Sequence, residues 1–359
     1  MADIAHTVPS VITTKDGSEF GFDRPGLQIT QFDAGPTRSR DWLGYNLRTY
    51  DLDPSLWQSG TTALQQWSAF WHHIGGGSEC GYIVEPVSET HRDLVCGGLG
   101  DASQTTFPIP VVAPTAVTVF VDGVPQEAAA YTIHSAANLY PTDAGTLPSS
   151  TDDVAVEGSG NSIGISSGVA SDGLTCAKIT AAGTAPALAV PKYASGHKCA
   201  VTVADTYTAV CPVLATAASN KYKLTVRYYD VGGGYLSADT SAAMDAAVGV
   251  WTVLSSEVVA DASAVYATAS VVQNATEADV FYVGGFALNP GDYTRWHLPS
   301  QSPGLIEFAA APAAGARITA TATGCRVSRC RFEPGSSWRV SSAGHAASRS
   351  IRAVEVIEV

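Results

Sequence analysis

Four aromatic residues in the middle of the chain are of types that suit contact with sugar rings. A flat aromatic side chain offers a large contact area at a low cost in side-chain entropy, so its chemistry is stacking on a ring face. Tyr229 is the best single candidate, because it lies opposite the apolar face of a predicted strand. Trp251 opens another predicted strand, where a core position is the competing interpretation. The candidate glycan-binding residues are Tyr229, Trp251, Tyr193 and Tyr235.

Residues of types that could support catalysis or metal binding are present, but the sequence does not indicate that they converge on one site. The sequence has no H-E-x-x-H motif and no P-loop. Asp152 and Asp153 could contribute a carboxylate pair for glycoside hydrolysis, but the separation of the side chains decides that chemistry. His72 and His73 are adjacent, so on a helix they point about 100° apart and do not converge on one ion. We therefore expect no catalytic residues, no metal site and no cofactor.

The composition favours a mainly β protein. Hydrophobic residues make up 45% of the 359 residues and charged residues only 15%, and glycine, alanine, serine, threonine and valine are abundant. A chain of this length and composition suggests two or three domains with many tight turns. Its formal net charge of −13 repels phosphate backbones, so we expect no nucleic-acid partner.

No stretch of the sequence has the pattern of a membrane span or a secretory leader. Its apolar runs stay well short of the roughly 20 residues that cross a bilayer, and Met1–His6 has no basic segment followed by an apolar one. We therefore expect assembly in the cytoplasm and no membrane insertion. The seven cysteines include no C-x-x-C pair, which favours buried thiols over metal ligands or disulfides.

Residues 1–97 are predicted to form an N-terminal β-domain with one helix. Strands are expected at Ser10–Thr14, Leu27–Phe32, Trp42–Leu52 and Gly81–Pro86. A helix is predicted over Leu64–Ile74, where apolar residues recur at helical spacing after a capping box and before a glycine triplet. We expect this helix to cover one side of the N-terminal sheet.

Two segments far apart in the sequence are predicted to form one small β-module. Residues 98–137 contain the hairpin signal Asp122-Gly123 between apolar runs, and residues 298–359 hold further short strands. Neither segment has enough strands to bury a face alone, so we expect them to pair and the residues between them to be an insertion. The alternating sequence Ile351–Val359 is expected to close the N-terminal sheet or to pair with a neighbouring subunit.

Residues 138–297 are predicted to form an inserted antiparallel β-sandwich of the jelly-roll type. Tyr222–Tyr229 alternates apolar and polar residues, which is typical of a half-buried strand. Trp251–Leu254, Val265–Val272 and Val280–Val283 repeat that length with turns between them. The predicted fold class is therefore mainly β, with an N-terminal domain, a split module and a sandwich between the halves of that module.

The split module resembles a small β-module that is common in tail proteins of tailed phages. The residues that carry this resemblance are Gly98–Val124 and Tyr131-Thr132, continued by Gly304–Phe308 and Ala311–Ala316. These segments follow one another along the chain in the same order as in the family.

The flanking and inserted segments extend the resemblance. Asp41-Trp42, the Leu64–Ile74 segment and the closing Ile351–Val356 are similar to distal-tail-like minor tail proteins of phages and gene transfer agents. Within the insertion, Tyr222–Tyr229 and Phe286–Tyr293 resemble the carbohydrate-binding jelly rolls found in phage tail and fibre proteins. Apart from the insertion, these matches cover about half of the chain.

The resemblance implies a structural virion protein of the phage tail tip. Its N-terminal domain would form a homo-oligomeric ring, usually a homohexamer, between the tail tube protein and the baseplate hub protein. The inserted sandwich would project outward and bind host cell-surface glycans or serve as decoration. A tail-associated glycan hydrolase and a free-standing lectin are the alternative interpretations.

Overall fold

The computed structural model describes the strands of the N-terminal segment and most of the chain from Cys80 onward. The described residues are 19–23, 27–30, 38–41, 47–52, 80–143, 150–166, 175–217, 221–274, 276–332, 338–340, 346–348 and 351–355. They fall into a larger unit within residues 87–327 and a smaller unit within residues 7–86 and 328–358.

Strands are the main secondary structure of the described residues, which confirms the mainly β class. The named helical elements among the described residues are short 3-10 turns, namely η1 (Ala128–Ala130), η2 (Tyr193–Ser195) and η3 (Pro299–Gln301). No helix in the described part of the chain has the length and apolarity to cross a membrane.

The smaller unit contains antiparallel strands from both ends of the chain. β4 (Leu47–Leu52) pairs with β1 (Glu19–Asp23) and with β26 (Ile351–Glu355). Further pairs join β2 (Leu27–Thr30) to β3 (Arg38–Asp41) and β24 (Trp338–Val340) to β25 (Ala346–Ser348). The alternating C-terminal sequence therefore has a partner strand within its own chain.

Several N-terminal predictions fall outside the described residues. They are the helix over Leu64–Ile74, the adjacent His72 and His73, and the strand over Ser10–Thr14. The strand expected at Leu27–Phe32 is confirmed as β2, and the strand expected at Trp42–Leu52 is confirmed from Leu47 onward as β4.

In the larger unit, strands from before and after the sandwich pair in one antiparallel sheet. β6 (Thr106–Val121) pairs with β22 (Pro303–Phe308) and with β23 (Arg317–Phe332), and β22 also pairs with β8 (Tyr131–His134). β5 (Cys80–Leu99) contributes the buried Leu94 to the core of this sheet, in one cluster with Phe107, Ile306 and Phe308. The rings of Phe107 and Phe308 meet edge to face with their centroids 5.8 Å apart.

The turn Asp122-Gly123 confirms the predicted hairpin. It joins β6 to β7 (Val124–Pro125), and both residues have positive φ, 50° for Asp122 and 79° for Gly123. Two consecutive positive φ angles are typical of a two-residue hairpin turn, which glycine, asparagine and aspartate tolerate best. The Asp122 carboxylate also accepts a hydrogen bond of 2.9 Å from the backbone N–H of Arg317.

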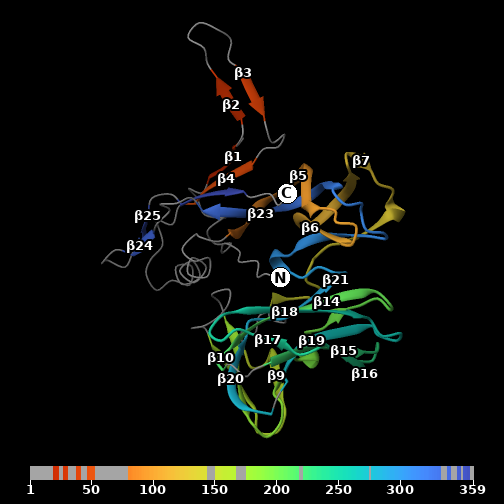
Figure 1. Ribbon diagram of the computed structural model, residues 1–359, viewed down its shortest axis with the longest axis vertical. Coiled ribbons are helices and arrows are strands. Elements are labelled where there is room, and N and C mark those ends of the chain that lie inside the picture. Colours follow the sequence, from red (N-terminus) through yellow and green to blue (C-terminus); the bar gives the residue numbers. More distant parts are fainter. Residues whose placement is uncertain are drawn as a thin grey trace. The chain divides into compact units, whose positions relative to one another are not determined.

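The segment between β8 and β22 forms an antiparallel β-sandwich, as predicted (Figure 1). One sheet, which we call the β14 sheet, has the order β10-β11-β20-β14-β18, with β21 also paired to β14. Its strands are β10 (Ser162–Ser166), β11 (Cys176–Ala182), β14 (Thr206–Ala215), β18 (Thr252–Val259), β20 (Ala278–Val283) and β21 (Ala287–Pro290).

The second sheet of the sandwich, which we call the β15 sheet, has the order β16-β15-β19-β12-β9. Two short strands also join it, β13 on β19 and β17 on β15. Its strands are β9 (Val154–Glu157), β12 (Leu188–Pro191), β13 (Cys199–Ala200), β15 (Lys221–Tyr229), β16 (Tyr235–Thr240), β17 (Met244–Asp245) and β19 (Tyr266–Gln273).

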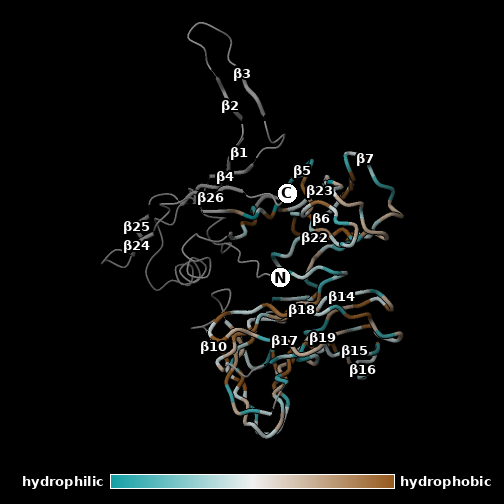
Figure 2. The backbone as a smooth tube through the Cα atoms, in the orientation of Figure 1, coloured by the Kyte–Doolittle hydropathy of each residue, from teal (hydrophilic) through white to brown (hydrophobic). Residues whose placement is uncertain are grey.

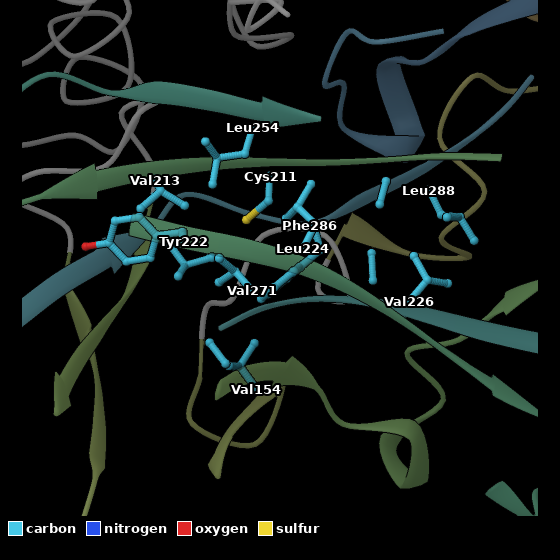
Figure 3. Packing of buried hydrophobic residues seen from close by; sticks show 14 of the residues in the cluster. Val154, Cys211, Val213, Tyr222, Leu224, Val226, Leu254, Val271, Phe286 and Leu288 are labelled. Carbon is cyan, nitrogen blue, oxygen red and sulfur yellow. The ribbon is translucent and has the colours of Figure 1, made fainter. Parts of the chain in front are cut away.

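The inner faces of the two sheets share one hydrophobic core. On β15, Tyr222, Leu224 and Val226 are buried in the same cluster as Cys211 and Val213 of β14 (Figure 3). Full burial of a side chain of this size contributes about 1.5–3 kcal/mol. The residues between them on β15 point to the opposite face, because successive side chains of a strand alternate. Figure 2 shows hydrophobic and hydrophilic residues interspersed along these strands.

Polar contacts join the start of the sandwich segment to its end. The backbone N–H of Asn138 donates to Oγ of Ser302 at 2.8 Å, and the Asn138 side-chain amide donates to the carbonyl of His297 at 2.7 Å. The backbone N–H of Leu139 donates to the carbonyl of Leu288 at 3.0 Å. All these groups lie far apart in sequence, so the contacts fix how the chain enters and leaves the sandwich.

Candidate functional site

The outer face of the β15 sheet gathers tyrosines from several strands. Tyr229 ends β15 on the outward side, and the register places it opposite Tyr266 of β19 and opposite Tyr235 of β16. A fourth tyrosine, Tyr193, comes from the turn η2 that follows β12. We call these four residues the tyrosine cluster.

The rings of the tyrosine cluster are in contact with one another. The ring centroids of Tyr193 and Tyr229 are 4.4 Å apart, with 33° between the ring planes. Tyr266 meets Tyr193 edge to face at 6.3 Å, and Tyr235 meets Tyr229 edge to face at 6.2 Å. Each such aromatic pair contributes about 0.5–1.5 kcal/mol beyond its buried area. Tyr235 is 61% exposed, so the cluster presents at least one broad ring surface to solvent.

The loop that carries Tyr193 is held by polar contacts with the residues before β9. His197 Nε2 lies 3.2 Å from a carboxylate oxygen of Asp153, and both side chains are nearly buried. The backbone N–H of Lys192 donates to the Asp153 carbonyl at 2.9 Å. Gly196 ends η2 with φ at 84°, where glycine adopts the left-handed region without strain. These contacts fix the position from which Tyr193 reaches Tyr229.

The loop between β15 and β16 lies against the Tyr193 ring. The Asp230 carboxylate accepts hydrogen bonds of 2.8 Å from the backbone N–H groups of Gly232 and Gly234, which shapes this turn. Gly233 has φ at 83°, and a Cβ at this position would lie 3.0 Å from Cε1 and 3.1 Å from Oη of Tyr193. The close approach of backbone to ring therefore requires glycine at position 233.

Lys198 places a positive charge among the tyrosine rings. Its Nζ lies 4.4 Å from the ring centroid of Tyr193 and 4.1 Å from that of Tyr266. It also donates a hydrogen bond of 3.1 Å to Oη of Tyr193. An ammonium group over a ring face contributes about 0.5–2 kcal/mol, depending on how far it is desolvated.

An ion pair crosses the same face of the sheet. The Arg227 guanidinium donates to both carboxylate oxygens of Glu157, at 2.7 and 2.6 Å. Arg227 belongs to β15 and Glu157 to β9, so the pair spans the strands β19 and β12 that lie between them. The hydrogen bonds and charge of Arg227 lower the pKa of Glu157, and those of Glu157 raise the pKa of Arg227. Both groups are therefore charged at neutral pH.

No protein-family model and no curated protein sequence matches the chain. The resemblance to distal-tail proteins therefore stays a prediction.

Several solved structures contain a similar arrangement of strands. The CBM22-1 and GH10 modules of a Clostridium thermocellum endo-1,4-β-D-xylanase, solved with xylohexaose, are 17% identical with a TM-score of 0.32, over 41% of this chain and 28% of that chain. The C-terminal family 22 carbohydrate-binding module of a Clostridium thermocellum xylanase is 16% identical with a TM-score of 0.32, over 44% of this chain and 98% of that chain. The enzymatically active domain of tailspike protein 4 from bacteriophage CBA120 is 10% identical with a TM-score of 0.34, over 43% of this chain and 22% of that chain.

The likeness to these structures is distant. The chain spans 28% of the xylanase structure and 22% of the tailspike structure. At such identities and TM-scores, what the tyrosine cluster can do has to be derived from its own residues.

The structure brings together three of the four aromatic residues predicted from sequence, and it places the fourth elsewhere. Tyr193, Tyr229 and Tyr235 belong to the tyrosine cluster. Trp251 precedes β18 of the β14 sheet and packs with the buried Val210 and Trp296. Val210 alternates on β14 with residues of the sandwich core, so this contact lies on the outer face of the other sheet.

Sequence reasoning missed two members of this site, Tyr266 and Lys198. Tyr266 begins a strand that was predicted, and its alternation with the buried Ala267 would have assigned it to the outer face. Nothing in the sequence indicates that Lys198 reaches the rings, because its position depends on the loop after η2.

Two serines of β10 match the spacing of a hydrolase nucleophile. Gly160–Gly164 and Gly164–Gly168 each have the form G-x-S-x-G. Ser162 and Ser166 begin and end β10, a strand paired with β11. A nucleophile of this motif sits on a sharp turn from a strand to a helix. Ser162 begins a strand and does not have that geometry, whereas residues 167–174 after Ser166 lie outside the described residues.

The possible metal ligands and the cysteine thiols of the described residues do not form a reactive site. Among the described residues, no group of three or more histidine, cysteine or acidic side chains is placed to hold a metal ion. Cys96, Cys199 and Cys211 are fully buried, and burial raises the pKa of each thiol. The expectation of buried thiols is confirmed for Cys96, Cys176, Cys199, Cys211 and Cys330, whereas Cys325 is only partly buried.

Proposed function

We propose that the outer face of the β15 sheet binds glycans by stacking sugar rings on the tyrosine cluster. The observation that carries this proposal is the convergence of four tyrosine rings, from the strands β15, β16 and β19 and the turn η2, on one outward face. A core needs no such arrangement, because the sandwich already has a separate apolar core between its sheets. Tyrosine suits the task since it combines an apolar ring with a polar hydroxyl.

The face also carries groups that can orient a polar ligand. Arg227 and Glu157 are fixed by their paired hydrogen bonds, so they need little reordering when a ligand binds. The turn at Asp230 approaches the Tyr193 ring, and the contact of His197 with Asp153 holds the loop that carries this ring. Preorganisation of this kind favours recognition of a ring in a defined orientation. The role proposed is binding without catalysis, which a polysaccharide depolymerisation assay checks.

Glycan binding is tested directly by removing the aromatic ring of Tyr229, which contacts two other rings of the tyrosine cluster. Tyr229→Ala is expected to weaken binding of the full chain to oligosaccharides at least tenfold, which corresponds to about 1.4 kcal/mol. Tyr282→Ala is the matched control, because Tyr282 lies on β20 of the other sheet and is also half-buried. Equal binding by Tyr229→Ala and the wild type, with both folded, would contradict the proposal.

For the whole chain we propose the role of a structural protein of a phage tail tip. The order of the sequence segments supports it, as does the pairing of β26 with β4, which returns the end of the chain to the N-terminal strands. The partners proposed are further copies of the chain in a sixfold ring, the tail tube protein and the baseplate hub protein. A ring follows when one surface of a subunit binds a different surface of the next and the rotation closes.

This role is tested by mass photometry and by electron microscopy of assembled particles. The expected result is a ring of six copies at the tail tip, formed alone or together with tail tube subunits. A chain that stays monomeric and does not join tail tube subunits would contradict the proposal, and would favour a free-standing lectin.

A further inference from the structure

Lys198 adds a feature that stacking on neutral sugars does not require. Its ammonium group lies over the faces of Tyr193 and Tyr266 and donates one hydrogen bond, to Oη of Tyr193. An ammonium has three N–H donors, so two remain for water or for a ligand. Within the described part of the chain, Lys198 forms no ion pair, whereas Lys192, Lys221 and Arg227 each do.

Charged groups of both signs lie around the tyrosine cluster. Arg227 is neutralised by Glu157, and Asp230 accepts hydrogen bonds from its own turn. Lys223 lies on the same outward side of β15 as Arg227 and Tyr229. Arg227 pairs with the carboxylate of Glu157, and the Asp230 carboxylate lies in the neighbouring turn, whereas Lys198 lies over the rings and pairs with neither. The chain as a whole carries −13.

The contacts of Lys198 within the tyrosine cluster use one of its three N–H donors and the faces of two rings. Partial burial of an ammonium removes some of its water, and ring faces replace only part of that hydration. A carboxylate from a ligand would complete the environment of Lys198, because a charge-assisted hydrogen bond is about twice as strong as a neutral one. The sugar ring that carries the carboxylate would lie on the adjacent tyrosines.

Resting on the proposed glycan binding, we propose that the tyrosine cluster selects acidic glycans, in which a uronic acid places its carboxylate on Lys198. The ring of the uronic acid stacks on the exposed tyrosine surface. The same ring without its charge keeps the stacking contact and loses the contact with the ammonium group.

The test compares acidic oligosaccharides with partners that differ only in the carboxylate. The probes are tetrasaccharides of galacturonate, alginate and hyaluronan, each before and after chemical reduction of the carboxylates to alcohols. Short probes are chosen because a long polyanion would be repelled by the net charge of the protein. The full chain is expected to bind at least one native tetrasaccharide about tenfold more tightly than its reduced partner.

Two variants of Lys198 assign the preference to this residue. Lys198→Met keeps the length of the side chain and is expected to bring native and reduced probes to within about twofold of each other. Lys198→Arg keeps the charge and is expected to keep the preference. Lys178→Met is the matched control, because it removes the same charge from an exposed position on β11 of the other sheet.

The outcomes separate this inference from the proposal on which it rests. Equal binding of native and reduced probes by the wild type, abolished by Tyr229→Ala, would overturn the acidic preference and leave glycan binding intact. A preference that survives in Lys198→Met would overturn the role of Lys198. Failure of every native probe to bind at millimolar concentration would overturn the acidic preference, and failure of the neutral reduced probes as well would count against glycan binding itself.

Discussion

The ring of Tyr193 lies against the ring of Tyr229, with 4.4 Å between the centroids and 33° between the planes. The two residues belong to different elements, since Tyr193 lies in η2 and Tyr229 ends β15. Their contact joins the loop after β12 to the end of a core strand and sets the floor of the proposed binding face. Substitutions that move either ring are therefore expected to reduce ligand affinity while the protein remains folded.

Gly233→Ala is expected to displace Tyr193. The new Cβ would lie 3.0 Å from Cε1 of Tyr193, closer than such contacts normally are. It would also place alanine at a φ of 83°, which costs about 1–2 kcal/mol. We expect a loss of oligosaccharide affinity of about tenfold, measured by isothermal titration calorimetry.

Gly249→Ala separates displacement of the ring from backbone strain. Gly249 has φ at 72°, and a Cβ there would meet no atom within 4 Å. The Gly249→Ala variant should show a fall in melting temperature similar to that of Gly233→Ala, and its affinity for the oligosaccharide should be unchanged. If the two variants lose affinity equally, the contact with Tyr193 is not the cause.

Trp251→Ala is expected to lower stability without changing binding at the tyrosine cluster. Trp251 packs with Val210 and Trp296 on the outer face of the β14 sheet. Since it is half-buried, the loss should be smaller than the 3–5 kcal/mol typical of a buried tryptophan, about 1–2 kcal/mol. Chemical denaturation and oligosaccharide titration check the two effects separately. Lost affinity at unchanged stability would instead support Trp251 as a ligand residue.

The ion pair of Glu157 and Arg227 gives stability that depends on pH. Arg227 lowers the pKa of Glu157 below its ordinary value of 4.5, so the unfolded chain binds this proton more tightly than the folded chain does. The contribution is present above pH 4.5 and is lost as the pH falls through the lowered pKa. Wild type and Glu157→Gln should therefore differ in the free energy of unfolding at pH 7 and converge towards pH 3. A constant difference over this range would contradict the expected coupling.

His297 gives a second pH dependence, over a different range. It is fully buried and lies 2.8 Å from Oη of Tyr293 through Nε2. Burial, and secondarily Arg295, lower the pKa of His297 from 6.5 to about 3. Between these values the unfolded chain binds the proton and the folded chain does not, so stability falls as the pH decreases below 6.5, by up to about 1.4 kcal/mol per unit.

The variant His297→Gln checks this assignment, because an amide does not titrate. Urea unfolding at pH 7.5 and pH 5 should show a larger loss of stability for the wild type than for the variant. The slope with pH is compared rather than the absolute stability, since the substitution also changes packing. Parallel losses in both proteins would mean that His297 does not titrate as described.

Alternation along a strand was the part of the fold that could be predicted best. Tyr222–Tyr229 was predicted as a strand with one buried face, and β15 has that pattern because one face packs on the β14 sheet. β9 and β10 were missed, since they lie in a stretch rich in serine, glycine and aspartate. Their strands are specified by pairing with β12 and β11, which no local pattern reveals.

The sequence predicted which types of residue form the candidate site better than it predicted how those residues are arranged in space. Tyr193, Tyr229 and Tyr235 were selected because aromatic rings suit sugars, and they meet in space through strand register and two loops. Trp251 was selected by the same reasoning and lies on another face, because the sequence does not show which sheet a strand joins. Lys198 was not selected, since its contact with two rings arises only in the folded loop.

A structure of the full chain with a bound oligosaccharide tests the central claim most directly. We expect a sugar ring stacked on the exposed surface of Tyr229 and Tyr235, on the outer face of the β15 sheet. A ligand bound instead beside Trp251 on the other sheet, or a tyrosine cluster left empty at saturating oligosaccharide, would contradict it.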